Sequence, residues 1–224
     1  SITEMMKQFP RSIQAIFGMT GFDLTTISGF YGVMFTYIAL MATVHAVIIG
    51  SDIIAKEERD RTTEFLFVRP ISRVKILTSK IFAGLFCLVI FNLVTWASSC
   101  YFIDYYGKNS MSSGDLALLM VGLLFLQLIF FFVGVAAASI LKRSKLSGSI
   151  ATSILLLAFI LTVFININEK LSDLKYFTPF RYFDAKDLLQ KGSLDPVYVS
   201  ISLALIIIMI VSAYKKYTSR DLSV

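Results

Sequence analysis

Long apolar runs alternate with short polar segments along the chain, and this alternation is the strongest structural signal in the sequence. A transmembrane helix needs about 20 apolar residues, because it rises about 1.5 Å per residue and must cross a hydrocarbon core of about 30 Å. Five runs meet this requirement closely: residues 27–50, 81–103, 116–140, 146–167 and 197–214. The pattern therefore predicts an all-α polytopic membrane protein, in which residues 1–224 form a single transmembrane domain with five transmembrane helices.

Two segments outside these runs also have helical character. In residues 1–26, apolar side chains recur at roughly helical spacing, which indicates an amphipathic helix on the outer membrane surface. Residues 168–196 are too long for a tight turn and predict an outer helical loop, re-entrant or lying on the surface, which Pro179 would interrupt. Aromatic residues of this loop are expected at the depth of the lipid headgroups: Tyr176, Phe177, Phe180, Tyr182 and Phe183.

Composition and charge agree with a membrane protein and orient it. Hydrophobic residues make up 56% of the chain and charged residues 16%, with a mean hydropathy of +0.75. When the connecting segments are assigned alternately to two sides, 13 basic residues fall on the side of residues 51–80 and 8 on the other. Because basic residues are retained in the cytoplasm, we expect residues 51–80 and the C-terminus there. The net charge of +6 then needs no nucleic-acid partner, and one further span before Ser1 would make six in the intact chain.

Residues 51–80 form the main polar segment, with seven basic and five acidic residues in thirty positions. Hydrocarbon cannot accept this density of charge, so the segment must lie in water. Ser51 or Asp52 is expected to cap a helix that runs to about Phe67, Pro70 ends the segment, and Ser72 can cap the next helix. The alternating signs favour a surface that contacts a partner, although an ordinary charged loop that fixes the topology fits the pattern equally well.

Two motifs resemble bacterial type-2 ABC transporter permeases. The run EERDRTTEFLFVRPISR is similar to their cytoplasmic signature, which has a Glu-rich start, Gly-Thr-x-Glu, two or three apolar residues and Pro-x-Ser-Arg. The matching residues are Glu57, Glu58, Thr62, Glu64, Leu66, Pro70, Ser72 and Arg73. The run TPFRYFDAKDLL resembles the Ser-Pro-Phe-Arg-Tyr-Phe element before the last span of these permeases. Arg61 replaces the usual glycine of the first motif, which puts the local turn geometry in doubt.

The resemblance implies that residues 51–73 form a coupling helix that docks on a separate ABC ATPase subunit. Two permease copies and two ATPase subunits would form a complex that exports its substrate from the bacterial plasma membrane by alternating access. The chain has no phosphate-binding loop, so we expect no enzymatic site and no cofactor in it, with ATP and Mg²⁺ bound by the partner. The candidate contacts with the ATPase are Glu57, Glu58, Arg59, Arg61, Thr62, Glu64 and Arg73.

The apolar runs contain few polar side chains that could face a transported molecule. Asn92 and Gln127 lie near the middles of their spans, and Trp96 and Ser99 follow Asn92 on a mildly polar stripe. These four are candidates for the substrate path, although interhelical hydrogen bonding is the usual role of such residues. A path without fixed charge favours an apolar or amphipathic substrate, such as a drug or a membrane-active peptide, in contact with membrane lipid.

Three other functions are compatible with some of these features. An ATP-independent channel or transporter should show intramembrane charges or repeat-related broken helices, and neither is evident. A noncatalytic scaffold would recruit a partner through the same charged segment without transport. An enzyme acting inside the membrane has the least support, because the sequence has one histidine and no recognisable catalytic or metal-binding set.

Overall fold

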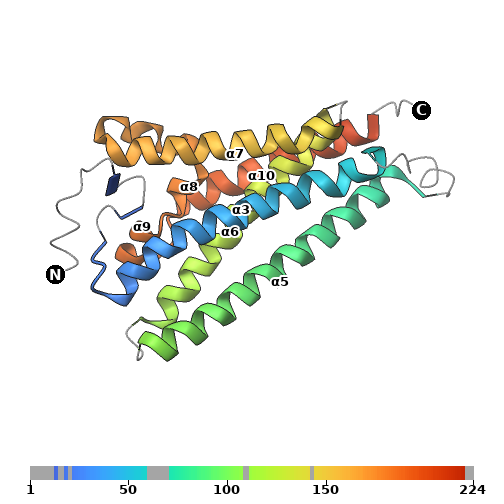
Figure 1. Cartoon of the computed structure of the whole chain (residues 1–224). Coiled ribbons are helices and arrows are strands. Elements are labelled where there is room, and N and C mark those ends of the chain that lie inside the picture. The colour runs from blue at the N-terminus through green and yellow to red at the C-terminus, as the bar shows by residue number, and fades with distance from the viewer. Residues whose placement is uncertain are drawn as a thin grey trace. The chain divides into compact units, whose positions relative to one another are not determined.

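The computed structural model describes residues 13–14, 18–19, 22–59, 71–107, 111–141 and 144–219. Over these residues the chain is helical and contains no strand, which confirms the all-α fold (Figure 1). In chain order the elements are α3 (Ile27–Arg59), α5 (Arg73–Gly107), α6 (Ser113–Ile140), α7 (Ser144–Ile167), the 3₁₀ helix η1 (Glu169–Phe177), α8 (Pro179–Tyr182), α9 (Ala185–Lys191) and α10 (Pro196–Ser219).

Five helices are long and apolar enough to cross a membrane, in agreement with the five predicted runs. The apolar spans within them cover 27–56, 73–106, 113–140, 146–167 and 196–219. Both α3 and α5 extend past the predicted runs into the charged segment. Most of the amphipathic helix expected in residues 1–26 lies outside the described residues.

The prediction that Ser51 or Asp52 begins a new helix was wrong, because α3 continues through both residues to Arg59. Ser51 is only 2% exposed, and its hydroxyl donates to the carbonyl oxygens of Val47 at 3.0 Å and Ile48 at 3.1 Å. A serine hydroxyl that donates to carbonyl groups of its own helix does not cap the start of a new helix. The charged residues at this end of α3 are therefore a direct continuation of the transmembrane helix.

Local sequence chemistry does set the beginnings of α3 and α5. Thr26 precedes α3 and accepts a hydrogen bond from the amide of Gly29 at 3.1 Å, the geometry of an N-cap. The Thr26 hydroxyl also donates to the carbonyl of Asp23 at 2.7 Å. Ser72 accepts from the amide of Lys75 at 3.4 Å, and this contact confirms the predicted cap of α5.

The chain divides into two compact units, and each long helix contributes residues to both. Unit 1 contains residues 1–42, 91–126 and 156–199, and unit 2 contains residues 43–90, 127–155 and 200–224. The fully buried side chains of unit 1 include Phe35, Leu119, Met120, Leu123 and Phe183. Those of unit 2 include Leu77, Leu88, Ile129, Phe131 and Leu155. Of the five spans, α6 has the largest buried share, 67% of its apolar window.

The loop at residues 168–196 is helical, as predicted, but its aromatic residues do not form one exposed belt. Pro179 occupies the first turn of α8 and separates it from η1. Phe180, Tyr182 and Phe183 are buried, whereas Tyr176 and Phe177 are exposed. The prediction of an aromatic belt was therefore wrong for the three buried rings, because they pack into the core of unit 1 and do not face lipid.

Candidate functional site

The segment predicted to contact an ATPase is described only in part. Glu57, Glu58 and Arg59 form the last residues of α3, and their side chains lie outside the described part of the chain. The other candidates Arg61, Thr62 and Glu64 also lie outside it. The backbone of α3 nevertheless joins Glu57–Arg59 to the membrane span without interruption.

The part of α3 just before its charged end is packed against α6 through close backbone contacts inside unit 2. A Cβ atom at Gly134 of α6 would lie 2.5 Å from the carbonyl oxygen of Val47 and 2.8 Å from the amide nitrogen of Ser51. A Cβ atom at Gly50 of α3 would lie 3.0 Å from the carbonyl carbon of Phe131. Only glycine allows two helices to approach this closely. At Val47–Ser51, α3 is therefore in direct backbone contact with α6.

Arg73, the remaining candidate for partner contact, lies at the start of α5. One guanidinium nitrogen, Nη1, donates to the carbonyl oxygen of Thr218 at 3.3 Å, near the C-terminal end of α10, where a cation satisfies exposed carbonyl groups. One turn further, the hydroxyls of Thr78 and Tyr214 are hydrogen bonded at 2.7 Å. Arg73 thus has an interaction within unit 2 that joins α5 to α10.

The four candidates for the substrate path do not form a single lined site. In unit 1, the Asn92 amide donates to the carbonyl oxygen of Met120 at 3.2 Å, and the Tyr31 hydroxyl donates to Ser99 at 2.8 Å. These bonds join α5 to α6 and α3 to α5. Trp96 is 38% exposed on α5, and Gln127 is fully buried in unit 2. The bonds of Asn92 and Ser99 give both residues a helix-packing role, and none of the four lines the cavity of unit 1.

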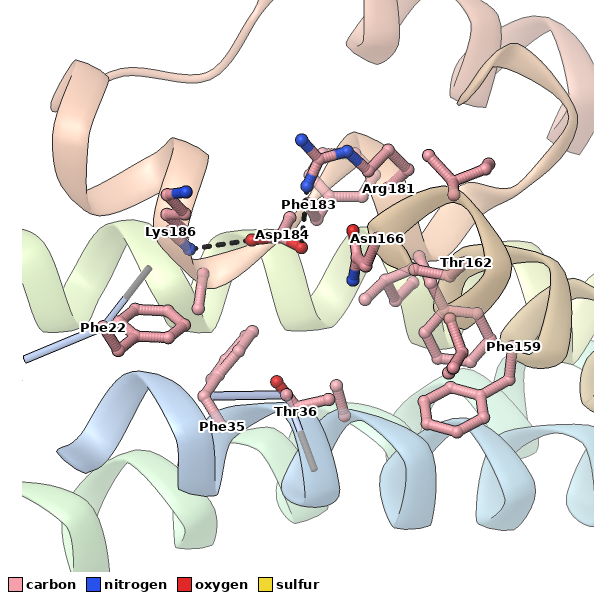
Figure 2. Close-up of a pocket in the computed structure, with 17 residues that line it drawn as sticks. Phe22, Phe35, Thr36, Phe159, Thr162, Asn166, Arg181, Phe183, Asp184 and Lys186 are labelled. Atoms are coloured by element: carbon pink, nitrogen blue, oxygen red, sulfur yellow. Dashed lines mark hydrogen bonds and ion pairs between the residues drawn. The ribbon is translucent and has the colours of Figure 1, made fainter. Parts of the chain in front are cut away.

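Unit 1 contains a cavity of about 250 Å³ between α3, α6, α7 and the segment from α8 to α9. Figure 2 shows Phe35 and Thr36 rising from α3 toward it, while Asp184 faces it from the opposite side. Its apolar lining includes Phe22, Phe35, Leu126, Phe159, Phe180 and Phe183. Its polar lining consists of Thr36, Thr162, Asn166, Arg181, Asp184 and Lys186. The cavity therefore has a mixed lining, with aromatic rings and polar groups contributed by α3, by α7 and by the segment from α8 to α9.

Charged side chains at the cavity are organised around Arg181. Its Nη1 lies 3.0 Å from Asp184 Oδ2 and its Nη2 lies 3.4 Å from Asp187 Oδ2. Asp184 also caps α9, because its Oδ1 accepts from the amide of Lys186 at 2.9 Å. Burial raises the pKa of Asp184, and the attraction of Arg181 offsets this effect only in part. One arginine therefore pairs with two carboxylates, of which only Asp184 lines the cavity, and Lys186 adds a second basic residue to the lining.

Buried hydroxyls attach the segment before α8 to α7. Thr178 is fully buried and contacts the Thr162 hydroxyl at 2.6 Å and the carbonyl oxygen of Ala158 at 2.9 Å. Thr162 contacts the same carbonyl oxygen at 3.0 Å. Two hydroxyl protons serve these three contacts, so one threonine donates to the carbonyl and the other donates to that threonine. This cluster holds the wall of the cavity in place.

Aromatic contacts hold the buried rings of Phe180, Tyr182 and Phe183 against neighbouring helices. Phe183 stacks on Phe125 with ring centroids 5.4 Å apart, and Phe180 meets Phe159 edge to face at 5.4 Å. Tyr182 stacks on Tyr198 at 5.0 Å, and its hydroxyl donates to the carbonyl oxygen of Tyr176. Phe180 and Phe183, which line the cavity, are therefore fixed in place by ring contacts with α7 and α6.

The sequence analysis did not identify this cavity, although it singled out the motif TPFRYFDAKDLL, which supplies part of the lining. Arg181 and Asp184 are three residues apart in TPFRYFDAKDLL, and a charged pair inside an aromatic segment is a signal for a partly buried ion pair. Phe35, Phe159 and Asn166 carry no such signal. They lie within predicted apolar runs, and the sequence does not show which positions of such a run face lipid and which face a cavity.

The family model described as ABC-2 family transporter protein matches residues 2–222. No curated protein gives a significant match to the chain. The family match covers nearly the whole chain, including all five apolar helices, and it agrees with the resemblance found in residues 57–73 and 178–189. The chain belongs to the ABC-2 transporter family and is a membrane-spanning permease subunit, for which the family implies an ABC ATPase partner.

Proposed function

We propose that the chain is the permease subunit of an ATP-driven exporter in a bacterial plasma membrane. In this proposal, a separate ABC ATPase that binds ATP and Mg²⁺ docks on residues 51–73 at the cytoplasmic side. Two copies of each subunit move an apolar or amphipathic substrate, such as a drug or membrane-active peptide, outward by alternating access. The chain itself contributes no catalytic step.

The observation that carries this proposal is the unbroken helix α3. Its charged end, Asp52–Arg59, continues the span without a hinge. Just before this end, Gly50 and Gly134 bring the backbone of α3 against α6. Packed helices move as near-rigid bodies rather than deforming continuously. Closure of an ATPase pair against Glu57–Arg59 would therefore shift α3 together with α6.

The experiment compares ATP hydrolysis by the co-purified complex in lipid for the wild type and for Glu57→Lys combined with Glu58→Lys. We expect the reversed charges to remove the permease-dependent stimulation of the ATPase, because charge complementarity sets the docking geometry. The control is Asp104→Lys combined with Asp173→Lys, which changes the net charge equally at two exposed positions of unit 1. Equal melting temperatures would show that both variants are folded.

Three outcomes separate the proposal from its alternatives. Stimulation of wild-type size in the Glu57/Glu58 variant would refute docking through these residues. Stable association of the wild-type chain with the ATPase but no stimulation would favour a noncatalytic scaffold. Substrate flux that needs no ATPase would favour a channel or secondary transporter.

A further inference from the structure

The helices α5 and α10 each carry a stripe of exposed, mainly apolar side chains that ends in a lysine. In both stripes the positions are separated by four, three and four residues, so the side chains of each stripe lie on one helix face. The stripes are Lys75, Ser79, Phe82 and Phe86 on α5, and Ala204, Ile208, Val211 and Lys215 on α10. A lysine at the end of an apolar stripe holds its ammonium group at the depth of the lipid headgroups.

Two contacts inside unit 2 join α5 and α10 at the ends that carry these lysines. Arg73 donates to the carbonyl oxygen of Thr218, and the hydroxyls of Thr78 and Tyr214 are hydrogen bonded at 2.7 Å. An early residue of α5 meets a late residue of α10 in both contacts, so the helices are antiparallel here. We call this line of contact the α5–α10 seam.

Both stripes lie on the same side of the seam. On α5, Leu77 is fully buried and Lys75 is exposed, and on α10, Ala213 is fully buried and Lys215 is exposed. The buried sides of both helices face the interior of unit 2, so both stripes face away from it. Lys75 lies three residues before the α5 hydroxyl of the seam, and Lys215 lies one residue after the α10 hydroxyl. At 1.5 Å per residue, the two lysines are therefore offset by only about 3 Å along the helix axes.

The charges of these lysines are not neutralised within the described part of the chain. Neither Lys75 nor Lys215 forms an ion pair with the residues that the structure describes. The described side chains of unit 2 include one acidic residue, Asp52, and six basic residues: Lys56, Arg73, Lys75, Lys80, Lys215 and Lys216. This excess of positive charge at the end of an apolar surface attracts an anion with apolar chains.

We propose that the α5–α10 seam binds an anionic phospholipid, with its phosphate between Lys75 and Lys215 and its acyl chains along the two stripes. Below the lysines the stripes offer exposed Phe82 and Ile208, which suit acyl chains and give a soluble anion no polar contact. A second copy in the same membrane orientation would bring equal groups of lysines together across a twofold axis, and like charges oppose such a contact.

The inference goes beyond the proposed export function, because lipid binding needs neither an ATPase nor a substrate. In the orientation proposed above, this lipid belongs to the cytoplasmic leaflet. A zwitterionic lipid such as phosphatidylcholine carries a cation of its own beside the phosphate, so the lysines should discriminate against it.

The test titrates the purified full chain in micelles with dioleoylphosphatidylglycerol or dioleoylphosphatidylcholine and counts bound lipids by native mass spectrometry. Each lysine beside an anionic headgroup contributes about fivefold in affinity. We therefore expect the first phosphatidylglycerol to bind roughly 25-fold more tightly than phosphatidylcholine. Lys75→Gln combined with Lys215→Gln should remove this preference and leave phosphatidylcholine binding unchanged.

The matched control is Lys56→Gln combined with Lys216→Gln, which removes the same charge at two exposed positions of unit 2 outside the stripes. It should keep the preference for phosphatidylglycerol, whereas diffuse attraction would fall equally in both variants. All four positions except the intended charges stay unchanged in size and polarity, and equal melting temperatures would show that both variants are folded. Glycerophosphoglycerol, the same headgroup without acyl chains, should not displace the bound lipid even in large excess.

Several results would overturn the inference. These are equal binding of the two lipids, a preference that survives the Lys75/Lys215 exchange, an equal loss in the control variant, or displacement by glycerophosphoglycerol. Dimers that bind no phosphatidylglycerol would also overturn it, because a second copy would then cover the stripes. Each result can occur while ATPase stimulation stays normal, so failure of this inference is distinct from failure of the proposed function. Conversely, selective lipid binding by a chain that stimulates no ATPase would leave the inference standing.

Discussion

Substitution of Gly134 by alanine tests whether the contact between α3 and α6 depends on a missing side chain. The new Cβ would lie 2.5 Å from the carbonyl oxygen of Val47, whereas ordinary contacts begin at 3.4 Å. The two backbones would therefore have to separate by about 0.9 Å at this point. Because the obstacles are backbone atoms, no rotamer change can relieve the clash, and overpacking of this kind costs about 1–3 kcal/mol.

Alanine also gains about 1 kcal/mol of helix propensity over glycine, so a matched variant is needed to isolate the clash. Gly148→Ala supplies it, because a Cβ there would lie an ordinary 3.4 Å from the Ser51 hydroxyl in the same unit. Both variants gain the same propensity, so the difference between them measures the overpacking cost. At about 2–4 °C per kcal/mol for chains of this length, Gly134→Ala should melt roughly 2–12 °C below Gly148→Ala.

The assay is thermal unfolding of the purified full chain, followed by loss of the monodisperse peak after heating. We expect Gly148→Ala to melt at or above the wild-type temperature and Gly134→Ala below it. A Gly134→Ala variant that melts as high as Gly148→Ala would refute the close contact between α3 and α6. It would also remove the structural support for transmission of movement from the charged end of α3.

Three further predictions concern polar contacts of unit 1. Tyr31→Phe should lower stability by about 1 kcal/mol through loss of the bond to Ser99, and a double-mutant cycle with Ser99→Ala should show strong coupling; additive effects would contradict the bond. Thr178→Val should cost about 1–3 kcal/mol in thermal unfolding with little change in volume, because it removes two buried hydroxyl contacts; wild-type stability would show that the contacts contribute nothing. The pKa of Asp184 is raised above 3.8, so the folded state binds its proton more tightly than the unfolded state. The melting temperature of the wild type relative to Asp184→Asn should therefore fall as the pH rises through the folded-state pKa, and a difference independent of pH would contradict the raised pKa.

The apolar pattern by itself determined the fold class and the five spans. A helix in hydrocarbon satisfies its own backbone hydrogen bonds, so a run such as residues 116–140 has one stable structure regardless of its neighbours. Local chemistry also determined the start of α5, because the Ser72 side chain needs only the amide of Lys75 nearby. The family resemblance rested on the identity and spacing of residues in 57–73 and 178–189, which can be compared with known motifs without a structure.

Features that depend on contacts between distant segments needed the tertiary structure. The sequence predicts Ser51 as a helix cap, but α3 packs against α6 at Gly50 and Gly134 and continues as a helix past Ser51. The sequence predicts interfacial anchors at Phe180, Tyr182 and Phe183. In the structure these rings pack in the core of unit 1, because they contact rings on α6, α7 and α10. The cavity likewise exists only where α3, α6, α7 and the segment around Asp184 meet. Hydrophobicity requires an apolar side chain to leave water, but only the packing of distant segments decides whether it meets lipid, another ring or a ligand.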